Sequence, residues 1–218
     1  MNSKIELGGD NTMLSADVDV NANVNPPQAE VRKIDYAHFN ISDFKTPRDV
    51  CDYMESEYAL ACGKDKSRVL LHFILKNIVS FEQNYKFEEI EEMFKLLSNT
   101  ESIVGSSPLE MCVNVFWAGD AMREKVIDLL EMLIGFGKKD ARYFGLVEYL
   151  LTHQRVANQS IPMACTLADS GKFEPCIMKK LPENMQERLR KETFYVENRD
   201  TGRMFCYSLL TYELVYVD

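Results

Sequence analysis

Most of this chain is patterned as a series of short amphipathic helices, and that pattern limits the folds open to it. Consecutive helices begin about 20 residues apart, so the connections are short and neighbouring helices should run antiparallel. This spacing fits a compact irregular bundle or a short repeat-like array, although the residues themselves do not repeat. The apolar residues recur at helical spacing in segments that begin near residues 47, 67, 86, 108, 121 and 141.

Two of these helices begin with the same local signal. Thr46 stands before Pro47 and three residues before Asp49, a pattern typical of a capped helix N-terminus. Ser107 stands in the same way before Pro108. Thr-Pro and Ser-Pro are also dipeptides that proline-directed kinases accept, and a phosphate is favoured at a helix N-terminus. Thr46 and Ser107 are therefore candidate phosphorylation sites.

Glycines are expected to end several of the helices, among them the fourth, at Gly119. Gly63 follows the first helix, and Gly135 and Gly137 follow the fifth. Asp140 should then cap the next helix. The run from Gly135 to Lys139 superficially resembles a phosphate-binding loop, but it lacks that motif's spacing and follows a helix rather than a strand. A helix end explains these residues better.

The segment from about residue 67 to 80 is the most apolar of the series. Its apolar side chains cover most of the helix circumference, so we expect this helix to be central, with His72 as a hydrogen-bonded core residue. The segment from about 86 to 98 is amphipathic instead, with glutamates on its outer side. The predicted core includes Phe73, Ile74, Phe94, Phe116, Leu130 and Phe144.

From Thr193 onward the pattern changes from helix to strand. Residues 193–198 and 203–208 flank a polar loop that contains Gly202, which predicts a β-hairpin. A third alternating segment follows at residues 212–216. So small a sheet must pack one face on the helices and leaves an open edge for pairing. The candidate partner-binding residues are Tyr212, Leu214, Val215 and Tyr216.

Residues 1–34 differ from the rest because they contain no aromatic residue and five asparagines, so we predict a disordered arm. Its run 31–34 has the composition to pair with the open strand edge. A helical domain should follow at 35–192, and a β element packed on it at 193–218. The predicted fold is mainly α, with six to eight helices in an irregular antiparallel bundle or repeat-like array and a small C-terminal antiparallel β element.

The charge balance restricts the class of partner. The chain has 25 basic and 34 acidic residues, a net charge of −9, which argues against nucleic acid and anionic membranes. Even the most basic stretch, residues 172–203, holds eight basic and six acidic residues. No apolar run is long enough to span a bilayer, and the start lacks a signal-peptide pattern. We therefore expect an intracellular protein, cytoplasmic or nuclear, with reduced cysteines.

Motifs for chemistry are missing from the sequence. The six cysteines form no Cys-x-x-Cys pair, and no Gly-x-Ser-x-Gly is present, so we predict no metal, cofactor or catalytic residue. The preferred interpretation is a non-enzymatic adaptor or regulatory subunit that binds one or more proteins through helical grooves or the C-terminal strand edge. Two alternatives stay open: a small enzyme with Cys165 and His153 in its cleft, and a structural homodimer.

Overall fold

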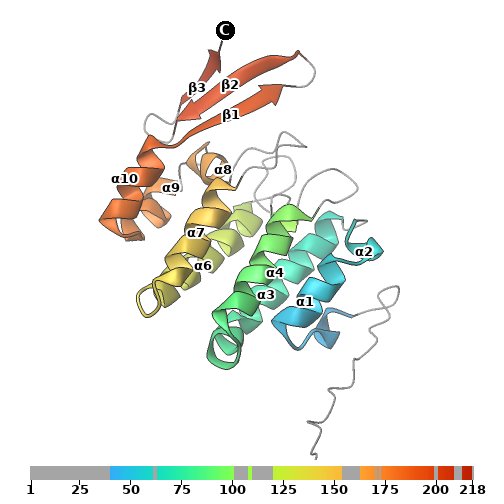
Figure 1. Ribbon diagram of the computed structural model, residues 1–218. Coiled ribbons are helices and arrows are strands. Elements are labelled where there is room, and N and C mark those ends of the chain that lie inside the picture. The colour runs from blue at the N-terminus through green and yellow to red at the C-terminus, as the bar shows by residue number, and fades with distance from the viewer. Residues whose placement is uncertain are drawn as a thin grey trace, which may run out of the picture. The chain divides into compact units, whose positions relative to one another are not determined.

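The computed structural model confirms a mainly α fold with a small antiparallel sheet at its C-terminal end (Figure 1). By its internal contacts the chain divides into Met1–Lys33 and Ile34–Asp218, and all described residues belong to the second unit. Ser107, Phe116, Gly119, Tyr212 and the predicted arm 1–34 lie outside the described residues. The structure describes residues 40–60, 63–100, 108–109, 120–153, 163–169, 171, 173–198, 201–208 and 213–217.

The described part of the chain contains nine α-helical segments, two of them only four residues long, and three strands. The α-helices are α1 (Pro47–Met54), α2 (Glu57–Leu60), α3 (Lys64–Asn84), α4 (Phe87–Asn99), α6 (Asp120–Gly137), α7 (Arg142–Thr152), α8 (Met163–Asp169), α9 (Phe173–Cys176) and α10 (Glu183–Lys191). The 3-10 helices are η1 (Ile41–Asp43) and η2 (Met178–Lys180). The strands are β1 (Thr193–Asn198), β2 (Arg203–Ser208) and β3 (Glu213–Val217).

The longer helices are arranged as stacked pairs rather than around one central helix. Helix α4 packs between α1 and α7, while α3 packs against α6 behind them (Figure 1). Helix α6 also packs against α7, which follows it in the chain. Among the two arrangements that the helix spacing allows, this one corresponds to the repeat-like array. None of the helices in the described residues is both long and apolar enough to cross a membrane.

Helix α1 begins as predicted from its sequence. The Thr46 hydroxyl oxygen accepts a hydrogen bond from the Asp49 backbone N–H at 3.1 Å. The Asp49 carboxylate in turn accepts from the backbone N–H groups of Thr46 and Lys45, both at 2.7 Å. Pro47 occupies the first helical position, where a missing N–H has no cost. Three backbone donors at this helix start are thus satisfied locally.

Removing this cap should weaken the fold measurably. We expect Thr46→Ala to lower the free energy of unfolding by about 1 kcal/mol, because the Asp49 N–H loses its acceptor. Urea denaturation followed by circular dichroism measures the change. Thr46→Ser keeps the hydroxyl and is the matched control. If both variants lost the same stability, the methyl group rather than the cap would be responsible.

Two predicted helix ends are wrong. Gly63 does not stop a helix but stands as the N-cap of α3, and α1 ends earlier, at Met54. Helix α6 continues through Gly135 and ends at Gly137. Phe136 between these glycines is buried, and its ring centroid lies 5.4 Å from that of Tyr143. Tertiary packing here outweighs the tendency of glycine to end a helix. Asp140 still serves the start of α7, since its carboxylate accepts from the Arg142 N–H at 3.1 Å.

The expectation that α3 is a central helix with His72 in the core is also wrong. Val69 and Val79 are 47% and 45% exposed, and His72 is exposed as well. These residues share a stripe with Arg68 and Lys76, whose charged groups favour contact with water over burial. The opposite side of α3 carries the predicted core residues. Phe73, Ile74, Phe94 and Leu130 are buried as predicted, whereas Phe144 is only half-buried.

The C-terminal sheet confirms the predicted hairpin and third strand. Its order is β1-β2-β3, and both pairings are antiparallel. Gly202 adopts a φ of 65° in the hairpin loop, a conformation that favours glycine. Phe194 and its cross-strand partner Tyr207 are 6% and 3% exposed and belong to the main hydrophobic cluster. One face of the sheet therefore contributes to the core.

Candidate functional site

The two residues on which an enzymatic reading depends have different surroundings. His153 follows the last residue of α7 and stacks on the Tyr149 ring, with centroids 4.5 Å apart. Cys165 in α8 is fully buried at 0% exposure. A nucleophilic thiol has to be reached by its substrate, and Cys165 lacks that access.

Another thiol, Cys51 of α1, is unsuited to nucleophilic chemistry for an electrostatic reason. Burial, together with the negative charge of Glu92, raises its pKa to about 12. The group therefore stays a neutral thiol near neutral pH, and the thiolate is the reactive form. Within the described residues, no group of three or more histidine, cysteine, aspartate or glutamate side chains is placed to hold a metal ion.

The predicted partner-binding residues that the structure describes lie in β3, at one edge of the sheet. Leu214, Val215 and Tyr216 pair with Tyr207, Cys206 and Phe205 of β2, respectively. In the described residues β3 pairs only with β2, so its other side is a strand edge. Such an edge carries backbone donors and acceptors that can pair with another strand.

The outer face of the sheet carries apolar side chains that the sequence interpretation missed. Tyr195 of β1, Met204 of β2 and Val217 of β3 are 57%, 37% and 43% exposed. Met204 and Val217 are direct cross-strand partners, so they lie on the same face. Tyr195 follows the buried Phe194 and therefore points to the side away from the core. We call these three residues the outer apolar face.

The sequence did hold a signal for this face, because side chains along a strand point alternately to its two faces. Once Phe194 is assigned to the core, its neighbour Tyr195 must point outward, and Met204 follows from the hairpin register. Assigning Phe194 to the core needs the packing of the sheet on the helices, because Phe194 and Tyr195 are both large and apolar.

One of the two candidate phosphorylation sites is described. Thr46 is half-buried and its hydroxyl accepts the capping hydrogen bond from Asp49. A phosphate on this hydroxyl would gain from the N-terminus of α1 but would lie beside the Asp49 carboxylate. Phosphorylation of Thr46 and of Ser107 stays a prediction.

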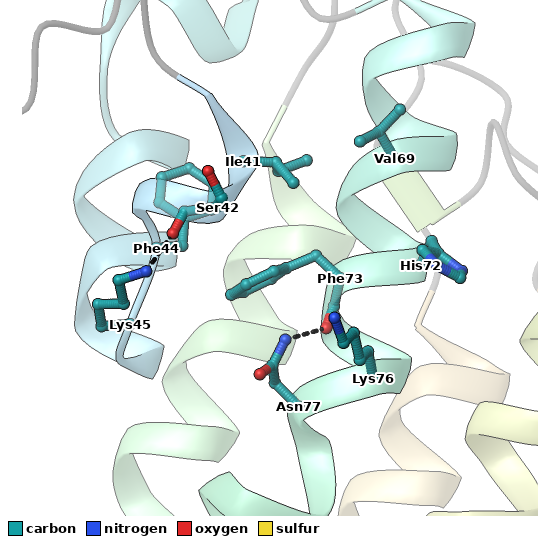
Figure 2. A pocket seen from close by; sticks show the side chains of 9 residues that line it. All are labelled: Ile41, Ser42, Phe44, Lys45, Val69, His72, Phe73, Lys76 and Asn77. Atoms are coloured by element: carbon teal, nitrogen blue, oxygen red, sulfur yellow. Dashed lines mark hydrogen bonds between the residues drawn. The ribbon is translucent and has the colours of Figure 1, made fainter.

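A second surface feature is a cavity of about 350 Å³ between η1 and α3 (Figure 2). It brings together residues that are far apart in the sequence, and its wall mixes cationic with apolar side chains. The lining residues are Ile41, Ser42, Phe44, Lys45, Val69, His72, Phe73, Lys76 and Asn77. No protein-family model, curated protein or solved structure matches the chain. Among the described residues, the outer apolar face and this cavity are the candidate binding surfaces.

Proposed function

We propose that this chain is a non-enzymatic protein-interaction module, acting as an adaptor or regulatory subunit, whose contact surface is the C-terminal sheet. The observation that carries the proposal is the outer apolar face, formed by Tyr195, Met204 and Val217 on three neighbouring strands. Neighbouring exposed apolar side chains are typical of surfaces that another protein covers. Tyrosine and methionine are also enriched at protein interfaces.

The free edge of β3 gives the partner a defined way to bind. A partner strand added beside β3 would pair with its backbone, and its side chains would extend the sheet's outer face. Val217 lies on β3 itself, so the outer apolar face reaches this edge. Backbone pairing would then supply affinity, and contact with Met204 and Val217 would supply selectivity.

The thiols support an intracellular setting for this interaction, in the cytoplasm or nucleus. Among the described cysteines, Cys51, Cys165, Cys176 and Cys206 form no disulfide with one another, which is compatible with a reducing compartment. The net charge of −9 favours a protein partner over nucleic acid.

The outer apolar face can be tested with exposed substitutions that spare the core. A double variant, Met204→Lys with Val217→Lys, places charge on the face, and Val79→Lys is the matched control. Val79 is 45% exposed, close to the 43% of Val217, but it lies on α3. Each tagged protein is used for affinity capture from cell lysate with quantitative mass spectrometry. We expect at least one protein to be captured by the wild type and by Val79→Lys but lost with the double variant.

An identical set of captured proteins for all three chains would contradict the proposal. Sedimentation velocity on the purified chains covers the homodimer alternative. A dimer that the double variant dissociates would mean that the partner is a second copy of the chain.

Proline substitutions then distinguish binding through the free edge of β3 from binding through the outer apolar face. Successive N–H groups of a strand point to opposite sides, so one of Leu214→Pro and Val215→Pro removes a donor of the free edge, and the other removes a donor of the β2 ladder. We expect the variant that keeps its thermal stability to lose the captured protein. Full binding by that variant would limit the contact to the outer apolar face.

A further inference from the structure

The cavity between η1 and α3 has a charge that is unusual for this acidic chain. Lys45, His72 and Lys76 line it, and no acidic residue is among its described lining residues. From Lys66 to Phe81, moreover, α3 contains no aspartate or glutamate. The wall of the cavity is therefore positively charged although the whole chain carries −9. Local charge of this kind attracts anions.

Neither cavity lysine forms an ion pair with a described carboxylate, although the Asp49 carboxylate accepts from the Lys45 backbone N–H at 2.7 Å. The Lys45 ammonium donates to the Ser42 backbone carbonyl (Figure 2). Arg48, three residues from Lys45, shows the contrast, because it forms ion pairs with Asp52 and Glu92 at 2.9 Å. The charge of the cavity lysines is thus available to a ligand.

His72 and Asn77 add hydrogen-bonding groups to the cavity. The His72 Nδ1 atom lies 3.2 Å from the ammonium nitrogen of Lys125 in α6. An ammonium group only donates, so the lysine is the donor in this contact. The Asn77 side-chain nitrogen donates to the Phe73 carbonyl at 2.8 Å (Figure 2), which leaves the amide oxygen as an acceptor.

Apart from Ser42, the rest of the lining is apolar, so a bare inorganic anion would fill the cavity poorly. Phe73 is 8% exposed and packs edge-on against Phe44, with ring centroids 5.8 Å apart. Val69 is 47% exposed, and Ile41 lies across from it on η1 (Figure 2). A volume of about 350 Å³ is within the range of small-molecule sites.

We propose that this cavity binds a small organic anion, in which a carboxylate or phosphate group is joined to an apolar body. The acidic group would lie against Lys76, and the apolar body would cover Phe73 and Val69. The same wall would disfavour neutral apolar molecules, which leave the lysines unsatisfied, and inorganic anions, which leave the valine in water. This site is separate from the sheet and independent of the proposed protein interaction.

Titration of the full chain with simple probes tests this proposal. Phenyl phosphate and benzoate combine a ring with either acidic group, whereas inorganic phosphate and benzyl alcohol each lack one half. Binding is followed by the amide signals of the ¹⁵N-labelled protein. We expect phenyl phosphate, benzoate or both to saturate the protein with a Kd below about 10 mM, and the two half-probes to bind at least about tenfold more weakly. The affected amides should include Ser42 and Asn77.

Charge reversal at one lysine locates the site. Lys76→Glu should weaken binding of the aromatic anion at least about tenfold, because an attraction becomes a repulsion. Lys138→Glu makes the same charge change at an exposed lysine between α6 and α7, and it should change the Kd by less than about twofold. Three results would each overturn the proposal: no saturable change with either aromatic anion, equal losses in the two variants, or affected amides remote from η1 and α3.

Discussion

Replacing Phe73 with alanine should lower the free energy of unfolding by about 3–5 kcal/mol. The ring is only 8% exposed, and it lies between two other buried rings. Its centroid is 5.8 Å from that of Phe44 and 6.3 Å from that of Phe81. Truncation therefore removes the buried ring from its apolar surroundings and leaves a cavity where η1 and α3 meet.

Val69→Ala is the matched control, because Val69 lies one turn away on the same helix but is 47% exposed. It should change the free energy of unfolding by less than about 0.5 kcal/mol. Chemical denaturation at equilibrium measures both variants. A loss below about 1 kcal/mol for Phe73→Ala would show that the ring does not help to hold η1 on α3.

The same helix shows how far helical periodicity can predict burial. Helical periodicity correctly predicted that Phe73 and Ile74 lie on the buried side of the helix. It could not identify the exposed side, because Val69 and Val79 extend the apolar residues onto the side that also carries Arg68 and Lys76. Whether a neighbour covers such a face depends on tertiary packing, and here none of the described residues covers Val69 or Val79 fully.

The two candidate sites also differ in how far the sequence could predict them. Turn residues and strand alternation are local, so the hairpin and its open edge were predictable from residues 193–217 alone. The cavity was not, because Lys45 and Lys76 belong to separate elements that only folding brings together. A local pattern holds no information about which surface residues of two distant segments will face each other.

Gly137 is the last residue of α6, and the structure also gives it a role in close packing. Helix α6 continues to Gly137, and a Cβ atom at this position would lie 2.8 Å from the Phe144 ring atoms Cδ1 and Cε1. It would also lie 2.9 Å from Cγ, the ring atom nearest the backbone. Rotation of the ring about its Cβ–Cγ bond moves Cδ1 and Cε1 but not Cγ, so the ring as a whole has to move.

We therefore expect Gly137→Ala to lower the free energy of unfolding by about 1–3 kcal/mol, the usual cost of forcing an extra methyl group into a packed site. Gly135→Ala, two residues earlier in α6, should have the opposite effect. It is exposed, a Cβ atom there meets nothing within 4 Å, and alanine favours the helix over glycine by about 0.5–1 kcal/mol. Equilibrium denaturation of the two variants measures whether each change raises or lowers the free energy of unfolding. Stabilisation by both alanines would mean that Phe144 moves aside freely, and that the glycine at 137 is not required by its approach to this ring.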